Sequence, residues 1–291
     1  MSGLWEGNLK LNFFIFGLGQ IGSSFSLALK RANISNSILG KDLKRRNYFK
    51  GLIDEYVEDW RRGIEKADVV IISTPVMEII KLVREIAPLL SKDQILLDTG
   101  STKKRILKEM QRYPERILIG GHPMAGSIRR GKDAIDENLF SGKPFFISFP
   151  HEYSRKGEEI IKYILRSIGG IPYEIDGELH DLFTSVVSHL PYVLSIALYS
   201  VFLDFYKKDK RIENFISSGF IGSTRLALTD SKVARDILIT NSSNIVAQIE
   251  RFISELRKLK KGIEKNDFYN FISEIKKVAE KRRKDYENFR S

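Results

Sequence analysis

A predicted strand that runs directly into a Gly-x-Gly-x-x-Gly motif constrains this chain more than any other feature. The strand covers Asn12–Phe16, the motif glycines are Gly17, Gly19 and Gly22, and a helix is predicted over Gln20–Ala32. In such a unit the first glycine permits a tight turn, the second lets the backbone approach a pyrophosphate, and the third lets the helix pack close to the strand. The phosphates then bind free N–H groups at the helix start. The order of these parts therefore predicts a dinucleotide-binding unit rather than an ordinary glycine-rich turn.

An acidic residue at the end of the next predicted strand supports this prediction. Asp42 follows the strand Ser37–Gly40, about 20 residues beyond the last motif glycine, where an acid is expected to bind the adenosine ribose. A carboxylate there favours NAD and repels the 2′-phosphate of NADP. Lys41 and the basic residues 44–46 could instead bind that phosphate, which leaves NADP as an alternative cofactor. The residues expected to contact the cofactor are Gly17, Gly19, Gln20, Ile21, Gly22, Asp42, Ser73, Thr74 and Pro75.

Strands and helices alternate through the first half of the chain. Further strands are predicted over Asp68–Ser73, Gln94–Asp98, Ile117–Gly120, Pro144–Phe149 and Ile171–Ile175. Further helices are predicted over Leu43–Lys50, Val76–Leu90, Thr102–Arg112 and Arg155–Ile168. Because this alternation gives a parallel sheet with helices on both faces, the predicted class is α/β with a mostly parallel N-terminal sheet.

Strand signals end near Asp176, and helical periodicity continues to the C-terminus. One apolar stripe has spacings of four and three residues and consists of Ile245, Ile249, Phe252, Leu256 and Leu259. Such a stripe is typical of an internal core helix or of a subunit contact. We therefore expect a dinucleotide-binding domain over residues 1–175 and an all-helical C-terminal domain over residues 176–291.

Composition excludes several classes of protein. With no cysteine among 291 residues, the chain has no disulfide framework, thiol nucleophile or cysteine metal site, and we expect no metal. The net charge of +11 is spread over basic residues that alternate with acids, which disfavours a nucleic-acid partner. The longest apolar run is shorter than a membrane span, and residues 1–10 lack the pattern of a secretory signal. We expect a cytoplasmic protein with a small-molecule ligand.

His122 and Ser101 are the candidates for chemistry in the first domain. His122 directly follows a predicted strand, and ligands of open α/β sheets bind beyond the carboxyl ends of the strands. A histidine there is a candidate acid or base. Ser101 follows another strand end, where it can cap the next helix or present its hydroxyl to the site. Lys103 is expected to lie in solvent rather than meet an anion.

Two residues of the helical region are candidates for ligand contact. His189 lies among apolar residues and is either a hydrogen-bonded core histidine or a ligand contact. Arg225 follows Gly-Ser-Thr, and its guanidinium suits a carboxylate, although a surface arginine has the same appearance in sequence. His180 is expected to be structural, near a helix start.

Taken together, these segments resemble the prephenate dehydrogenase family, which includes arogenate dehydrogenases. The resemblance extends over nearly the whole chain and rests on several short stretches in the family's order. These stretches are Gly17–Gly22, Asp98–Lys103, Gly121–Ser127, Asn138–Gly142, His180-Asp181, Ser188–Pro191, Thr224-Arg225 and Arg235-Asp236.

The resemblance implies a Rossmann domain followed by a helical domain that forms a homodimer. It implies oxidative decarboxylation of prephenate by NAD+ to 4-hydroxyphenylpyruvate and CO2, a step toward tyrosine. His122 is similar to the residue that accepts the proton of the substrate C4 hydroxyl, and Ser101 to the hydroxyl that orients it. His189 resembles a substrate-positioning residue, and Arg225 resembles the arginine that binds a substrate carboxylate. Because the base must be neutral, activity is expected to fall at low pH.

Three departures from the family pattern leave the substrate open between prephenate and arogenate. Ile128 stands where many relatives carry an acid, Phe220–Gly222 replaces Phe-Arg-Asp, and Ala234 replaces a tryptophan. Two other functions compete with this one. A β-hydroxyacid dehydrogenase would rely on a catalytic lysine in its helical region, and an NAD-binding regulatory module would bind DNA without turnover.

Overall fold

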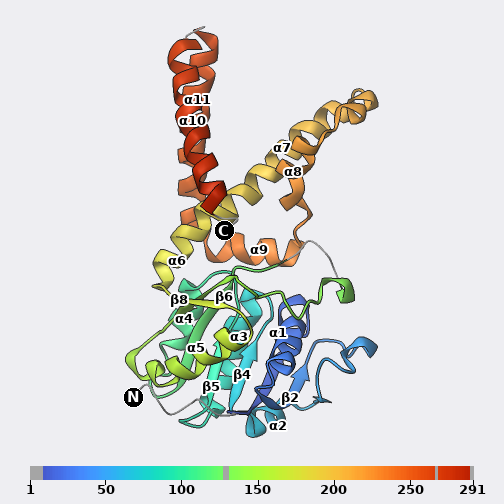
Figure 1. Cartoon of the computed structure of the whole chain (residues 1–291), viewed down its shortest axis with the longest axis vertical. Coiled ribbons are helices and arrows are strands. Elements are labelled where there is room, and N and C mark those ends of the chain that lie inside the picture. Colours follow the sequence, from blue (N-terminus) through green and yellow to red (C-terminus); the bar gives the residue numbers. More distant parts are fainter. Residues whose placement is uncertain (1–8, 127–130, 266–267, 289–291) are drawn as a thin grey trace. The chain divides into compact units, whose positions relative to one another are not determined.

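The computed structural model describes residues 9–126, 131–265 and 268–288 of the chain (Figure 1). The chain divides into two compact units, Met1–Ser242 and Ser243–Ser291. The first unit holds the sheet, its covering helices and a further series of helices. The second unit consists of two long helices.

One eight-stranded sheet forms the centre of the first unit, in the order β3-β2-β1-β4-β5-β6-β7-β8. All neighbouring strands are parallel except β6 and β7, which run antiparallel. The order reverses at β1, so its carboxyl end borders the crevice where α/β sheets bind ligands. The strands are β1 (Leu11–Phe16), β2 (Ser35–Lys41), β3 (Glu55–Tyr56), β4 (Val69–Ile72), β5 (Ile95–Asp98), β6 (Ile117–Pro123), β7 (Pro144–Ser148) and β8 (Ile171–Glu174).

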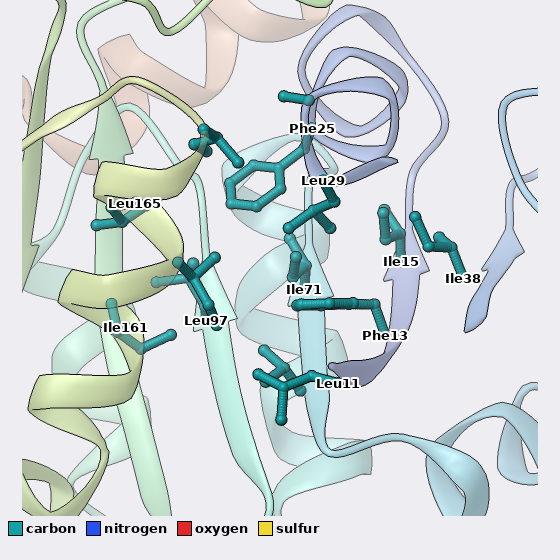
Figure 2. Close-up of a cluster of buried hydrophobic side chains, with 14 of the residues drawn as sticks. Leu11, Phe13, Ile15, Phe25, Leu29, Ile38, Ile71, Leu97, Ile161 and Leu165 are labelled. Atoms are coloured by element: carbon teal, nitrogen blue, oxygen red, sulfur yellow. The ribbon is translucent and has the colours of Figure 1, made fainter. Parts of the chain in front are cut away.

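Helices cover both faces of this sheet, as the α/β prediction requires. Side chains of β1 alternate between two cores, with Phe13 and Ile15 in one and Phe14 and Phe16 in the other. The first core packs against α1 and α5, from which Phe25, Leu29, Ile161 and Leu165 project toward the strands (Figure 2). The second core packs against α2, α3 and α4. The helices are α1 (Gln20–Arg31), α2 (Trp60–Lys66), α3 (Val76–Ile86), α4 (Lys104–Met110) and α5 (Glu158–Ser167).

Two short elements were not predicted, and one predicted helix is wrong. Residues Leu43–Lys50 contain only a 3-10 turn, η1 (Asn47–Phe49), instead of a helix. The missed strand β3 has two residues, and the missed helix α2 has seven residues, of which six are charged, glycine or tryptophan. Neither element is long enough to show an apolar period.

A run of helices follows the sheet within the first unit. Helix α6 (Gly177–Thr184) continues through a π-helical turn, η5 (Ser185–His189), into α7 (Leu190–Tyr206). The shorter elements after it are η6 (Lys210–Phe215), α8 (Ser218–Thr224), η7 (Arg225–Leu228) and α9 (Ser231–Thr240). The 30-residue run Gly177–Tyr206 is long and apolar enough to cross a membrane by length and composition alone, and 11% of its most apolar window is buried. This corrects the expectation that every apolar run is too short.

The second unit contains α10 (Ser242–Glu264) and α11 (Phe268–Asn288). The two helices lie side by side, and a Cβ atom on Gly262 of α10 would lie 3.1 Å from the ring of Phe271. Along the stripe predicted in α10, Ile245 is buried whereas Leu256 and Leu259 are exposed. Its N-terminal end is therefore core, and its C-terminal end is free for another contact.

The glycine motif yields a paired prediction about stability. A Cβ atom on Gly22 would lie 1.9 Å from the carbonyl oxygen of Gly17, whereas one on Gly19 would have no neighbour within 4 Å. We expect Gly22→Ala to lower the free energy of unfolding by roughly 2–3 kcal/mol, because the backbone must shift to relieve the clash. Gly19→Ala should change it by less than about 0.5 kcal/mol. Urea denaturation of both variants measures the difference.

The stability of Gly22→Ala could also contradict the described packing of α1. Alanine is about 1 kcal/mol more favourable than glycine inside a helix. If Gly22→Ala is as stable as the wild-type chain or more stable, α1 does not pack against β1 as closely as described.

Candidate functional site

The glycine loop connects β1 to α1 at the carboxyl edge of the sheet. Gly17 has a φ of +83°, and a Cβ atom there would lie 2.4 Å from the carbonyl oxygen of Ser73 at the end of β4. Only glycine fits both the conformation and the approach. Helix α1 begins directly after Gly19, which faces open space. The loop therefore leaves room for a ligand at the start of a helix, as the motif predicts.

A cleft of about 630 Å³ lies on one side of this loop. Its walls include Gly17, Gly19 and Asp42, and the residues Ser73–Pro75 that follow β4. Asp42 accepts a hydrogen bond from the backbone N–H of Leu18 at 2.7 Å, so its carboxylate also fixes the glycine loop. The predicted acid thus stands at the end of β2 and lines the cleft, where it can accept hydrogen bonds from the hydroxyl groups of a ribose.

The basic residues beside Asp42 have other contacts. Lys41 lines the cleft but forms a 2.7 Å ion pair with Glu58. The guanidinium groups of Arg45 and Arg46 lie over the rings of Tyr56 and Tyr48, with distances of 5.3 and 5.9 Å to the ring centres. Each of these three basic side chains therefore already has a partner within the protein.

A second cleft, of about 400 Å³, shares Ser73, Thr74 and Pro75 with the first. Gln20 and Ile21 at the start of α1 line it as well. The hydroxyl oxygen of Thr74 is buried and has no hydrogen-bond partner among the described residues. Since an unpaired buried hydroxyl is costly, this oxygen is available to a ligand that extends through both clefts. Of the nine predicted cofactor residues, only Gly22 lines neither cleft, because it packs against the loop.

The second cleft also contains both candidates for chemistry, His122 and Ser101. The sequence predicted that His122 directly follows its strand. In the structure His122 lies within β6, where it pairs with Phe146 of β7. Ser101 does not cap α4, whose N-cap is Lys103 without a side-chain hydrogen bond. The serine hydroxyl is therefore free of the capping role that sequence left open. The cleft brings the predicted base, a hydroxyl and the glycine loop together.

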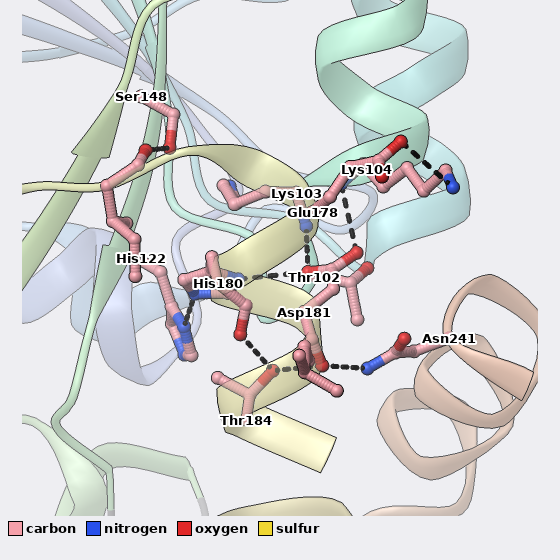
Figure 3. A network of polar contacts seen from close by, with 12 residues as sticks. Thr102, Lys103, Lys104, His122, Ser148, Glu178, His180, Asp181, Thr184 and Asn241 are labelled. Carbon is pink, nitrogen blue, oxygen red and sulfur yellow. Dashed lines mark hydrogen bonds and ion pairs between the residues drawn. The ribbon is translucent and has the colours of Figure 1, made fainter. Parts of the chain in front are cut away.

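His122 is the first member of a chain of buried polar side chains (Figure 3). Its Nδ1 lies 2.8 Å from Nε2 of His180, and Nδ1 of His180 lies 2.9 Å from Oδ1 of Asp181. His180 and Asp181 are each 1% exposed and belong to α6. Sequence reasoning treated His180 as structural, and only its place in the resemblance to the family singled it out.

The carboxylate of Asp181 also holds the start of α4. Its Oδ1 accepts the backbone N–H of Lys103 at 2.7 Å, and its Oδ2 accepts that of Lys104 at 3.0 Å. The side chain of Asn241 donates to the backbone oxygen of Asp181 at 2.7 Å. Helix α6 is thereby fixed against the sheet edge beside His122, as the dashed contacts in Figure 3 show.

Lys103 is fully buried, which contradicts the expectation that it lies in solvent. Its ammonium group forms an ion pair with Asp98 at the end of β5 and donates to the backbone oxygen of Gly121 at 2.5 Å. Asp98 also accepts the backbone N–H groups of Gly100 and Gly121. A buried ion pair is tolerated when further hydrogen bonds satisfy both charges, as they do here. The pair fixes the loop of Ser101 to the strand of His122.

The surroundings of His122 favour the neutral imidazole. Burial lowers the pKa of His122 well below its ordinary value, and electrostatic interaction with His180, Lys103 and His189 would oppose a charge on it further. A neutral imidazole can accept a proton, whereas an imidazolium cannot. The site therefore favours the form of His122 that can accept a proton.

The structure does not bring the other two predicted site residues to the cleft. Among the described residues that line it, neither His189 nor Arg225 occurs. His189 is 2% exposed and lies 3.1 Å from the side-chain nitrogen of Asn241, and burial lowers its pKa to about 4. Arg225 is exposed at the start of η7. Ser127 and Ile128, which the sequence comparison used, lie outside the described residues.

Helix α9 supplies residues that sequence reasoning did not assign to a site. Asp230 and Val233 line the second cleft, and Lys232 and Arg235 line the first. Asp236 is 1% exposed and accepts the backbone N–H of Met77 at the start of α3. The motif Arg235-Asp236 was the available signal. In the part of the chain that the structure describes, no group of His, Asp or Glu side chains could hold a metal ion.

Comparisons with known proteins match this arrangement. Residues 25–172 match the model of the prephenate dehydrogenase nucleotide-binding domain, and residues 176–277 match that of the prephenate dehydrogenase dimerization domain. A prephenate dehydrogenase of Lactococcus lactis is 32% identical over 276 residues, which cover 91% of this chain and 76% of that protein. A prephenate dehydrogenase of Bacillus subtilis is 29% identical over 285 residues, with 94% and 76% covered.

A solved structure resembles the whole chain. The crystal structure of prephenate dehydrogenase from A. aeolicus in complex with hydroxyphenyl propionate and NAD+ has a TM-score of 0.87 and 27% sequence identity. The similarity covers 95% of this chain and 98% of that one. The two domain models and the sequence identities show that the chain belongs to the prephenate dehydrogenase family, with a Rossmann nucleotide-binding region followed by a helical region.

Proposed function

We propose that this protein catalyses the oxidative decarboxylation of prephenate to 4-hydroxyphenylpyruvate, with hydride transfer to NAD+, in tyrosine biosynthesis. The observation that carries the proposal is the cleft in which His122 and Ser101 meet the glycine-loop residues Gln20 and Ile21. A base and a dinucleotide site in one cleft are what hydride removal from a hydroxyl-bearing carbon requires. The family membership of the chain supports the same reaction.

The chain's own residues account for the proton in this reaction. Neutral His122 accepts the proton of the C4 hydroxyl while the hydrogen on C4 leaves as hydride, and Ser101 orients the hydroxyl or the imidazole. NAD+, when bound, accepts that hydride. Loss of the C1 carboxylate as CO2 returns an electron pair to the ring, which becomes aromatic. The C4 oxygen, left as a phenolate, takes the proton back from His122, so the product has its phenol hydroxyl, the imidazole is neutral again, and the net loss is one hydride and one CO2.

The residues present fit a bound dinucleotide. Gly19 leaves open space for the pyrophosphate, Thr74, whose buried hydroxyl has no hydrogen-bond partner among the described residues, lines both clefts, and Asp42 stands where a ribose hydroxyl would bind. The ion pair of Lys41 and the ring contacts of Arg45 support NAD over NADP.

Roles for His189 and Arg225 stay predictions. We propose, from the resemblance, that Arg225 binds a substrate carboxylate and that His189 acts from its buried position beside Asn241. Arogenate is the second candidate substrate, since Gly222 and Ala234 depart from the family pattern near these residues.

We also propose a homodimer formed through the helical region. An apolar groove of α7, η6 and α8 is exposed in the single chain, with Val201 58%, Phe205 58% and Phe215 82% exposed. A second copy that covers this groove would bury surface that is otherwise unfavourable in water. The matched family model carries the description of a dimerization domain. The domain boundary at residue 175, the cytoplasmic location and the absence of nucleic-acid or membrane partners stay predictions.

The proposed function is tested by following the absorbance of the reduced nicotinamide. Prephenate and arogenate are each supplied with NAD+ and with NADP+, and we expect the highest kcat/KM for prephenate with NAD+. Absence of reduced nicotinamide in all four combinations would exclude the enzyme. Salt-sensitive DNA binding without turnover would favour a regulatory module instead.

The pH dependence of kcat/KM follows from the surroundings of His122. Only the neutral imidazole is active, and its pKa is held well below 6.5. We therefore expect kcat/KM to stay level between pH 6.5 and 8 and to fall below that range, about tenfold per unit once the pKa is passed. A limb with its midpoint at or above the ordinary histidine value of 6.5 would contradict the described burial of His122.

Cofactor choice is expected to depend on Asp42. Asp42→Asn keeps an acceptor for the N–H of Leu18 but removes the negative charge that faces the cleft. We expect the ratio of kcat/KM for NAD+ to that for NADP+ to fall about tenfold, a change of roughly 1.4 kcal/mol. Glu85→Gln, which neutralises another carboxylate lining the same cleft, is the matched control and should leave the ratio nearly unchanged. Equal ratios in both variants would remove Asp42 from cofactor selection.

Dimer formation is expected to be sensitive to charge in the groove. Val201→Lys places an ammonium group on the surface that the second copy would cover, so the dissociation constant should rise at least about tenfold. Leu89→Lys, at a 52% exposed leucine outside the groove, should have no such effect. Light scattering coupled to size-exclusion chromatography measures both. A wild-type monomer, or equal masses for the two variants, would contradict this interface.

A further inference from the structure

The contact between His122 and His180 has a direction that the neighbouring groups determine. Both oxygens of Asp181 accept backbone N–H groups, from Lys103 and from Lys104, and a backbone N–H can only donate. Asp181 is therefore an acceptor on both oxygens. Its 2.9 Å contact with Nδ1 of His180 requires that this nitrogen carry the hydrogen.

The same argument assigns the hydrogens on the remaining ring nitrogens. When His180 is neutral and protonated on Nδ1, its Nε2 has a lone pair and can only accept. The 2.8 Å contact with Nδ1 of His122 then requires a hydrogen on that nitrogen. His122 is left with an unprotonated Nε2, which is the form that can take a proton from a ligand.

The ring of His180 is held firmly enough to impose this order. Its backbone N–H donates to the oxygen of Asp176, and its backbone oxygen accepts the hydroxyl of Thr184 at 2.9 Å. Its ring meets that of Phe146 edge to face, with centres 5.8 Å apart. At 1% exposure no bulk water competes for either ring nitrogen.

We propose that His180 is a positioning residue that holds His122 in its Nδ1–H tautomer, so that Nε2 of His122 is the atom that receives the substrate proton. The role in turnover rests on the proposed function, whereas the tautomer does not. A neutral imidazole in water favours the opposite tautomer, with the hydrogen on Nε2, so the selection needs a fixed acceptor. When the proton arrives at Nε2, the Nδ1–H of His122 still donates to His180, and no further proton has to leave.

The proposed direction requires that Nε2 of His180 accept a hydrogen bond. A doubly protonated His180 would donate from Nε2 and force the hydrogen of His122 onto the wrong nitrogen. The two backbone N–H groups on Asp181 already compensate its carboxylate.

The tautomer is measured directly by NMR on the dimer or monomer as purified, without substrate. The chain has four histidines, so 15N-histidine labelling gives four pairs of ring signals, assigned with His151→Gln, His189→Gln and His180→Gln. At neutral pH we expect His122 and His180 both neutral and both protonated on Nδ1. Protonation of His122 on Nε2, or a doubly protonated His180, would overturn the proposal whether or not the enzyme is active.

Kinetics of two variants test the consequence for the reaction. His180→Phe removes the acceptor but keeps a ring against Phe146, and kcat should fall roughly ten- to a hundredfold with little change in KM for NAD+. His180→Gln can present an oxygen to the Nδ1–H of His122 and should recover most of this loss. Thr184→Val is the matched control, because it removes a buried hydrogen bond to the same residue without touching the chain of rings.

The outcomes separate this proposal from the function on which its role depends. Unchanged kcat and pH profile in His180→Phe, with an active wild-type enzyme, would overturn the positioning role. Equal losses in His180→Phe, His180→Gln and Thr184→Val would indicate a merely structural role and overturn it as well. If the wild-type chain has no activity but shows the expected tautomers, the proposed function fails and the tautomer assignment stands.

Discussion

The carboxylate of Asp181 is the point on which the site depends. It accepts hydrogen bonds from the first residues of α4 and from His180, and Asn241 binds its backbone oxygen. One buried charge thus connects the edge of the sheet, the first helix after the sheet and the imidazole that reaches His122. The contacts to the carboxylate itself, from Lys103, Lys104 and His180, compensate the cost of burying its charge, and the two backbone donors fix the direction of the hydrogen bonds in the chain of rings.

The sheet supplies the rest of the arrangement through its topology. Because β1, β4 and β5 are parallel, the glycine loop, Ser73 after β4 and Ser101 after β5 all emerge along one edge, and the reversal of strand order at β1 opens a crevice there. The buried Lys103, paired with Asp98 at the end of β5, ties this strand end to β6 through the backbone oxygen of Gly121. The two clefts share Ser73–Pro75 as a common wall, so a ligand that extends from Asp42 to His122 passes the glycine loop.

Much of the fold was accessible from sequence because its signals are local. Strands such as Val69–Ile72 are apolar on both faces, and the glycine motif by itself indicates a tight turn. The short elements β3 and α2 were missed because they are too brief to show a period. The predicted position of Lys103 was wrong because its partners, Asp98 and Gly121, lie on two neighbouring strands. Only the folded sheet brings both of them to its ammonium group. His122 and His180 are 58 residues apart, and no spacing rule links them. The resemblance to a family marked both residues, but only the structure showed that they touch.

The antiparallel pairing of β6 with β7 has a consequence for how the site works. His122 is a ladder residue opposite Phe146 rather than the tip of a mobile connection. Its backbone conformation is therefore fixed when the chain folds. Binding of a ligand then carries no further entropy cost for ordering this segment. A rigid base of this kind tolerates little error in where the reacting carbon is placed, so discrimination between similar ring acids falls to whatever fixes the far end of the ligand.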